Sequence, residues 1–405
     1  MNTKIIAIAV VAVIAVAAVG AYVVLSNNDS DADMNIIGRV NTEGSAILLK
    51  NGENSADYVT IVEGEEPSEP HLGGNGKWVV FNKENWGGKV FTDPGASTIQ
   101  HVQLNDIADA MGLKFVQYSK DVAVSEDTLY FVPNIPTYAV FKSQSGLSNA
   151  VGGIFWEPQT SIAILSGDNC SMMVTTNDLF PGHTCCTIAA QHSYISSHKD
   201  ETVRFLAAYV ESVKKMTAAI SEKSGDNYNE VIKVAMKYVS MGEGVEDDQK
   251  KAAIENAFKY VVYTYADDSA GSLDNLEKDI ASMAEKFANS KTAKNDAAAL
   301  GFDSYDALAD KFVDSSYMED AVKYKLPENV GTANITVAVI GGDIHQLAIH
   351  YGMAMGIFDE YGIKIKLSTQ SNGPAVYTAM KNNDAQFGFI GAPPMTINSM
   401  NDKTI

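Results

Sequence analysis

The stretch "YKLPENVGTANITVAVIGGD", residues 324–343, restricts the fold more than any other feature of the chain. It follows a long region, 192–324, in which apolar residues recur at the spacing of amphipathic helices. From Ile335 to Val339 apolar and polar residues alternate, and the rest of the chain repeats a strand and helix pattern. This pattern is typical of the opening of an α/β domain, yet only about seventy residues of the sequence follow it.

The earlier part of the chain has patterns of the same kind. Residues 35–62 alternate as strands do, and residues 78–188 show strands separated by helices, which indicates βαβ units and a parallel sheet. A chain of 405 residues is too long for one ordinary core. The sequence therefore predicts an α/β fold with two lobes.

The N-terminus carries an unbroken apolar run, Ile5 to Leu25, after Lys4 and before the acidic stretch "SNNDSDADM". The run reaches the roughly 20 residues that span a bilayer and exceeds the roughly 7–15 of a signal-peptide core. We predict an N-terminal membrane anchor with the rest of the chain outside the cell membrane, and cleavage as a signal peptide with secretion stays open. No cysteine lies near the end of the run, so a bacterial lipoprotein is not expected.

Composition excludes several classes of partner. The chain has 50 acidic and 30 basic residues and a formal charge of −20, which argues against nucleic acid and anionic lipid. The only cysteines are Cys170, Cys185 and Cys186, so no disulfide framework is expected. One bridge from Cys170 to either of the other two would suit a location outside the cell.

Three strand-to-helix junctions have the same form. In "IGGDIHQ" we expect Asp343 to cap a helix with Gln346 as its capping-box partner, and in "PGASTIQ" we expect Ser97 and Gln100 to do the same. In "SNGPAV" we expect Pro374 at the first helical position. Ligands of open α/β sheets bind at such edges, where helix N-termini can hold a polar group without Lys or Arg.

Other loops add candidate groups. "IGAPP" follows a strand, Trp156 and Glu157 stand together in "FWEP", and His183 precedes two cysteines in "FPGHTCC". If both lobes face one cleft, His101, His183 and His345 could form a metal triad, although a structural role is the favoured interpretation for each histidine. No nucleophile elbow, Walker loop or Rossmann fingerprint is present, so we expect no catalysis.

Five phrases carry a family resemblance: "GGDIHQLAIHYGMAMGIFDEYGIKIKL", "NGPAVYTAMKNNDAQFGFIGAPP", "GGKVFTDPGASTIQHVQL", "FWEP" and "PGHTCC". Together they resemble the solute-binding proteins of ABC importers in the nitrate, sulfonate, taurine and bicarbonate class, which includes thiamine-pyrimidine binders. The resemblance covers nearly everything after residue 34. The family order differs, because its members begin with a strand like Ile335–Ile340 and end with a helix like "FVDSSYMEDAVKYK".

The order therefore resembles a circular permutation, in which Ile405 should lie beside the first strand after residue 34. The rival interpretation is that residues 335–405 are a truncated second copy of a family segment. It is disfavoured because each family segment appears once.

The resemblance implies a periplasmic-binding-protein-like (type II) fold with two lobes that close about a hinge on a ligand. The implied division is 1–34 signal or anchor, 35–77 lobe one, 78–188 lobe two, 189–334 helices and linker of lobe one, and 335–405 lobe one. The implied ligand-binding residues are Asp343, Ile344, His345, Ser371, Asn372, Gly373, Gly391, Ala392, Glu43, Gly44, Ser45, Ser97, Thr98, Gln100, Trp156, Glu157, His183 and Thr184.

By resemblance, the chain would capture a small polar solute at the cell surface and deliver it to an ABC permease driven by its ATPase. It would act as a monomer, without catalysis, cofactor or metal. The predicted cleft loops contain no Arg or Lys, and Asp343 and Glu157 add negative charge, which favours a neutral or cationic solute over a simple anion. The alternatives are an enzyme of the same fold resembling hydroxymethylpyrimidine synthase, and a sensor ectodomain.

Overall fold

The computed structural model describes residues 33–405 except 122, 145–146, 148, 168 and 242–244. About 44% of the chain is helix and 25% is strand, in several sheets, which agrees with the expected α/β class. The anchor predicted in residues 1–34 lies almost entirely outside the described residues. Within the described part, no helix is both long enough and apolar enough to cross a membrane.

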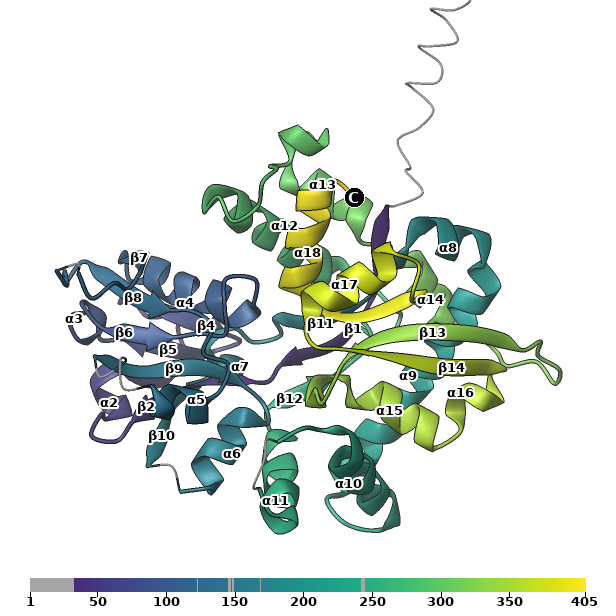
Figure 1. Ribbon diagram of the computed structural model, residues 1–405, viewed down its shortest axis with the longest axis horizontal. Helices are drawn as coiled ribbons and strands as arrows, with labels where there is room; N and C mark the ends of the chain where they lie inside the picture. The colour runs from purple at the N-terminus through teal and green to yellow at the C-terminus, as the bar shows by residue number, and fades with distance from the viewer. Residues whose placement is uncertain (1–32, 122, 145–146, 148, 168, 242–244) are drawn as a thin grey trace, which may run out of the picture.

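The first sheet has six strands in the order β12-β1-β11-β15-β13-β14 (Figure 1). β13 is parallel to both β14 and β15, whereas β11 is antiparallel to β15 and to β1. The late and early segments share this sheet, as the permuted order requires, since the last seventy or so residues supply three of its six strands. β11 lies between β1 and these three strands. The strands are β1 (Met34–Glu43), β11 (Thr184–Gln191), β12 (Val261–Tyr263), β13 (Ala333–Ile340), β14 (Ile363–Gln370) and β15 (Phe387–Gly391).

The second sheet also has six strands, in the order β10-β2-β9-β6-β8-β7. Its second strand is apolar without alternation because both faces are covered: Ile47 and Leu49 lie in one core cluster and Leu48 lies in the other. The strands are β2 (Ser45–Lys50), β6 (Val90–Thr92), β7 (Lys114–Gln117), β8 (Thr128–Val132), β9 (Ala150–Trp156) and β10 (Cys170–Thr175).

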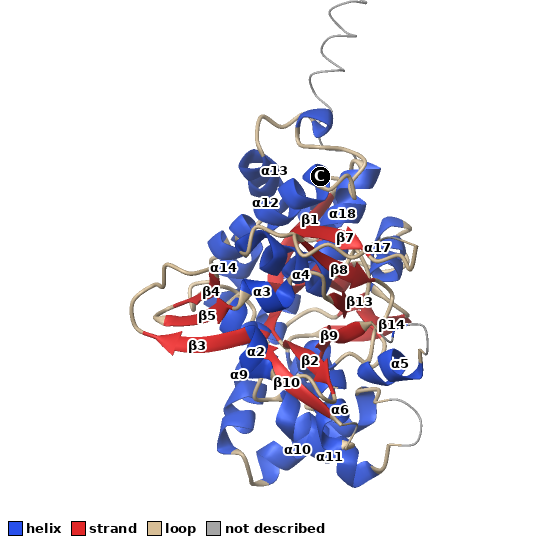
Figure 2. Cartoon of the chain, turned by 90° about the vertical axis from the view of Figure 1, so that its left-hand side faces the viewer, coloured by secondary structure: helices blue, strands red, loops and turns tan. Residues whose placement is uncertain are grey.

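A third sheet of three antiparallel strands projects from the second lobe (Figure 2). It consists of β3 (Val59–Glu63), β4 (His71–Gly74) and β5 (Lys77–Phe81). Residues 63–77, whose composition is typical of a surface loop, therefore contain strand residues as well.

Helices of the first lobe cover its sheet. The long α9 (Lys199–Glu222) contacts α14, α15 and α16, and α12 contacts α13 and α18. Their bounds are α8 (His192–Ser197), α10 (Asp226–Tyr238), α11 (Asp247–Ala257), α12 (Asp274–Asn289), α13 (Tyr305–Phe312), α14 (Ser316–Lys323), α15 (Leu347–Ala354), α16 (Ile357–Glu360), α17 (Gly373–Lys381) and α18 (Ala392–Asp402), with 3₁₀ turns η2 (Ala298–Leu300) and η3 (Ile344–Gln346).

The second lobe has shorter helices. α4 runs along the sheet beside β9 and β7. The helices are α2 (Ser55–Tyr58), α3 (Lys83–Trp86), α4 (Ile99–Ala110), α5 (Tyr138–Ser143), α6 (Gln159–Leu165) and α7 (Thr176–Leu179).

The chain passes between the two large sheets at Gly44 and again at His183, where β1 leads into β2 and the chain returns to β11. Glu43 and Gly44 both have positive φ, so the backbone turns sharply there. The boundaries expected at residues 77 and 188 therefore differ from the structure. Residues 45–77 belong to the second lobe, and the start of β11 belongs to the first.

The end of the chain lies beside the start of β1 (Figure 1). The backbone N–H of Met34 donates to the carbonyl of Thr404, with 2.9 Å between N and O. The expected proximity of Ile405 to the first strand after residue 34 is thus observed.

Candidate functional site

A cavity of about 480 Å³ lies at the edges where strands of both large sheets end. The second lobe contributes the loop after β6, the start of α4 and the end of β9, and the first lobe contributes the loops after β13, β14 and β15. Ten of the residues predicted to contact ligand line it: Ser97, Thr98, Gln100, Trp156, Asp343, His345, Ser371, Asn372, Gly373 and Gly391.

The start of α4 differs from its predicted capping box. Thr98, not Ser97, is the N-cap residue, because Thr98 is the last extended residue and its hydroxyl oxygen accepts from the His101 N–H at 3.4 Å. Gln100 does not reach back to the cap, and its side-chain amide donates to the Ser45 hydroxyl at 2.9 Å. Gln100 therefore joins α4 to the start of β2.

The junction after β13 differs in the same way. Asp343 is the predicted cap, and its carboxylate accepts from the His345 N–H at 3.0 Å. Gln346, the expected partner, accepts from the Ile340 N–H and donates to the Phe389 carbonyl, each at 2.9 Å. Gln346 thus holds the ends of β13 and β15 together, which fixes two of the loops that line the cavity.

At the junction after β14, the helix begins one residue earlier than predicted. Asn372 caps α17 by accepting from the Ala375 N–H at 3.0 Å. Pro374 is the second helical residue instead of the first, because the helix begins at Gly373. Gly391 holds the corresponding position before α18. α4, α17 and α18 therefore all begin at the cavity, and their free N–H groups are concentrated there.

Asp343 and His345 form a buried ion pair. His345 Nδ1 donates to Asp343 Oδ1 at 2.7 Å, and Nε2 donates to the Gly44 carbonyl at 3.3 Å. Burial lowers the pKa of His345, but the charges of Asp343 and Cys185 and these hydrogen bonds outweigh it and raise the pKa to about 9. The imidazolium and the carboxylate offset each other, and among the described residues that line the cavity none is Lys or Arg.

Eight predicted residues do not line the cavity: Glu43, Gly44, Ser45, Glu157, His183, Thr184, Ile344 and Ala392. Thr184 is fully buried, where its hydroxyl donates to Asp279 at 2.7 Å and accepts from Arg39 at 2.6 Å. The Glu43 carboxylate accepts from the Gly182 N–H at 2.6 Å and from the Asn177 amide. These buried groups hold the crossing between the lobes and do not face the cavity.

Glu157 is likewise internal, with 1% of its surface exposed. Its carboxylate accepts from the Ser161 N–H at 3.2 Å at the start of α6. Burial raises the pKa of Glu157, while hydrogen bonds from Thr160 and Ser161 and the charge of His345 oppose this effect. We expected this charge in the cleft, but in the structure it is buried behind the residues that line the cavity.

The prediction that three histidines could form a metal triad is wrong. His101 Nδ1 pairs with Asp93 at 2.9 Å, and His183 Nδ1 donates to the Phe180 carbonyl at 2.7 Å. Burial lowers the pKa of His183 to about 4, so this ring is neutral. Only His345 lines the cavity, and in the described part of the chain no three or more His, Cys, Asp or Glu residues are grouped to hold a metal ion.

Sequence reasoning missed four polar or sulfur-bearing residues that line the cavity: Gln159, Cys185, Cys186 and Ser240. The "FPGHTCC" phrase predicts His183 as the contact, whereas the two cysteines that follow it line the cavity. Ser240 follows α10, and only tertiary pairing brings it to the cavity, where its N–H donates to the Gly342 carbonyl at 2.9 Å. Within the described residues, no disulfide joins Cys170 to either cavity cysteine.

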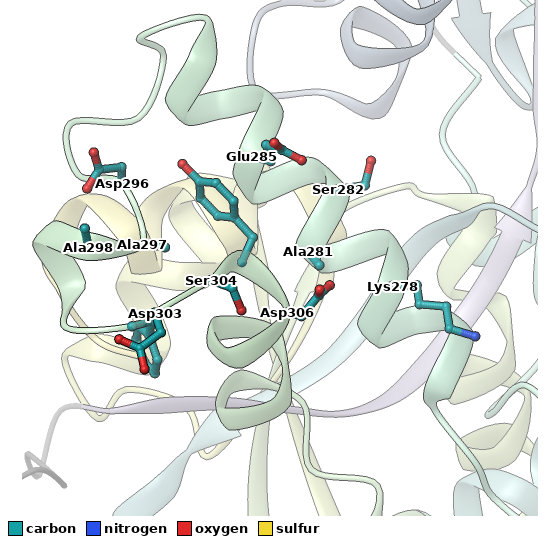
Figure 3. A pocket seen from close by; sticks show the side chains of 12 residues that line it. Lys278, Ala281, Ser282, Glu285, Asp296, Ala297, Ala298, Asp303, Ser304 and Asp306 are labelled. Atoms are coloured by element: carbon teal, nitrogen blue, oxygen red, sulfur yellow. The ribbon is translucent and has the colours of Figure 1, made fainter.

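A second cavity, of about 590 Å³, lies between α12 and α13 (Figure 3). Carboxylates dominate its charged lining, with Glu285, Asp296, Asp303 and Asp306 against Lys278. It takes no residue from the second lobe and lies away from the strand ends. The cavity between the lobes is therefore the candidate functional site.

No protein-family model, curated protein or solved structure matches this chain.

Proposed function

We propose that the chain is an extracytoplasmic solute-binding protein that captures a small polar solute between its lobes and delivers it to an ABC permease with its ATPase. The observation that carries this proposal is the cavity itself. Its walls come from both lobes and are built largely from the beginnings of capped helices, which suit reversible binding of a polar molecule.

The connection between the lobes supports opening and closing. The two passages of the chain lie side by side, because the Glu43 N–H donates to the His183 carbonyl at 3.3 Å. Two adjacent strand connections can act as a hinge while each sheet stays rigid. Closure would then surround the solute, and binding energy alone would drive the cycle.

The finer fold assignment belongs to the same proposal: a type II periplasmic-binding-protein-like fold in circularly permuted order, with a membrane anchor in residues 1–34. Two observations support the permuted order. Thr404 is hydrogen bonded to Met34, and the strand that opens the family pattern, β13, lies in one sheet with β1. The segment 325–329, which joins the two family ends here, is exposed.

The lining of the cavity favours a neutral or cationic solute. Asp343 and His345 compensate each other, so the cavity offers helix N–H groups, hydroxyls and amides instead of a net positive charge. Trp156 adds a half-buried aromatic surface at the end of β9. A simple inorganic anion would lack the Lys or Arg that such a ligand usually recruits.

The test is a thermal-shift screen of the purified protein with sulfonates, nitrate, pyrimidines, amines and metal ions. A solute at 100 times its dissociation constant should stabilise the fold by about 2.7 kcal/mol. Calorimetric titration of any hit should then show weaker binding to Trp156→Ala, Ser97→Ala and Asn372→Ala.

Trp78→Ala is the matched control, because Trp78 lies on the small third sheet, outside the cavity lining. Unchanged affinity in all three cavity variants would show that the solute binds elsewhere.

A further inference from the structure

Cys185 and Cys186 are adjacent in the chain, yet both line the cavity and their Sγ atoms are only 3.8 Å apart. Successive side chains of a regular strand point to opposite faces of the sheet. Two neighbouring thiols on one side therefore require a local distortion of β11.

The distortion is a β-bulge. In the pairing of β11 with β1, Thr184 lies opposite Thr42 and Cys186 lies opposite Asn41, so Cys185 is an extra residue on its strand. Bulges re-aim side chains and are frequent next to functional sites. The backbone thus holds the two sulfur atoms together without a disulfide between them.

The spacing of the sulfur atoms matches a chelate. Two thiolates bound at about 2.3 Å to one tetrahedral ion are separated by about 3.8 Å. The pair therefore needs little rearrangement to bind a single thiophilic ion, and the other coordination positions would be filled by water or a solute in the cavity.

The charges around the pair fit a divalent ion. Both cysteines are nearly fully buried, so two bare thiolates would be costly there, whereas two thiolates with one divalent cation are neutral. Asp343 and His345 are paired with each other, so together they add no net charge beside the ion.

We propose that Cys185 and Cys186 form a two-thiolate site, in the wall of the cavity, for a soft divalent cation of the zinc and cadmium class. The two thiols lose their protons as two sulfur–metal bonds form, so one ion is bound and two protons are released. This site goes beyond the solute-binding function and does not depend on transport.

Cd²⁺ titration into the reduced protein tests the site. We expect one Cd²⁺ per chain, a thiolate-to-cadmium charge-transfer absorption in the ultraviolet, and two released protons. Cys185→Ser and Cys186→Ser should each weaken binding roughly a hundredfold. Cys170→Ser is the matched control, since Cys170 begins β10 in the other large sheet, and it should bind as the wild type does.

A second measurement needs no variant. Bound Cd²⁺ should protect Cys185 and Cys186 from alkylation, as read by peptide mass spectrometry, while Cys170 is labelled at an unchanged rate. Equal Cd²⁺ binding by Cys185→Ser and wild type, or a Cys185–Cys186 disulfide in the protein as purified, would overturn the proposal. A screen without hits among the sulfonates, nitrate, pyrimidines and amines leaves this titration unaffected, so the two proposals fail separately.

Discussion

Gly44 lies where the chain crosses between the two large sheets, and a neighbouring side chain occupies the space that a Cβ atom would take. Its φ is +93°, and a Cβ atom there would lie 2.6 Å from His345 Nε2. Its carbonyl accepts from one group of each lobe, the His345 ring and the Glu157 N–H at 2.8 Å. One small residue thus connects the crossing between the two large sheets to a loop that lines the cavity.

We predict that Gly44→Ala lowers the free energy of unfolding by about 2–3 kcal/mol, because both the backbone conformation and the contact with His345 oppose a Cβ atom. Gly52→Ala is the matched control, with a φ of +92° and open space around it, and should lose only about 1 kcal/mol. Urea unfolding of both variants measures the difference. Equal losses would show that the His345 side chain moves aside freely to make room for the added Cβ atom.

The ion pair of His345 makes stability depend on pH. Its pKa rises from 6.5 to about 9 on folding, so the native state binds more protons than the unfolded state between these values. The stabilisation is complete below pH 6.5 and disappears as the pH rises through about 9. Cys185, whose pKa its hydrogen bond with Cys186 lowers to about 7, acts in the opposite direction over part of the same range.

We therefore predict the effect of His345 on pH-dependent stability for a protein with Cys185→Ser, in which Asp343 still pairs with His345. Between pH 6.5 and 9 this protein should lose about 2–3 kcal/mol more stability than the same protein with His345→Gln, as measured by urea unfolding. Parallel pH profiles would mean that His345 is not protonated in the fold.

At the scale of elements, the N-termini of capped helices line the cavity. The cap of α4 has a counterpart at α5. Thr98 caps α4 beside the cavity, and Thr137 caps α5 in the same lobe, where its hydroxyl accepts from the Val140 N–H at 3.1 Å. Thr137 does not line the cavity. Comparing substitutions of these two threonines therefore distinguishes the loss of a helix cap from the loss of a ligand contact.

Thr98→Ala and Thr137→Ala should each lower the free energy of unfolding by about 1 kcal/mol. Only Thr98→Ala should also weaken binding of the solute found by screening, as measured by calorimetric titration. If both variants bind that solute equally well, the start of α4 takes no part in the site.

At the scale of the whole molecule, the order of the strands along the chain differs from their order in the sheet. β13, β14 and β15 lie in one sheet with β1, and the two ends of the described chain meet at Met34 and Thr404. The connection at 325–329 is exposed. The chain can therefore be opened in this connection, whereas a break in a central strand would disrupt the sheet.

A rearranged chain should test this directly. We predict that joining Ile405 to Met34 by a short Gly and Ser linker, with new ends between Pro327 and Glu328, leaves the free energy of unfolding within about 2 kcal/mol of the original. Circular dichroism and urea unfolding measure it. The control opens the chain between Ala338 and Val339, which are buried in β13, and should not fold. Failure of the first protein with intact secondary structure elsewhere would show that the present order is required.

The sequence by itself determined the local structure. The alternation at Ile335–Val339 predicted β13, and Asp343 was correctly predicted as a cap, because period and capping depend on neighbours within a few residues. That the late segment shares a sheet with β1 was expected from the permuted order that the family resemblance implies, and not from a local pattern.

Tertiary structure alone decided which of these groups face the cavity. Gln100 and Gln346 looked like capping partners, but they bond to Ser45 and Phe389, which are remote in the chain. Glu157 became internal and Cys185 reached the cavity wall, because burial and a bulge in a sheet depend on the neighbouring strands. Local patterns encode helices and strands, whereas the direction of a side chain at a sheet edge is set by partners that only the folded chain brings together.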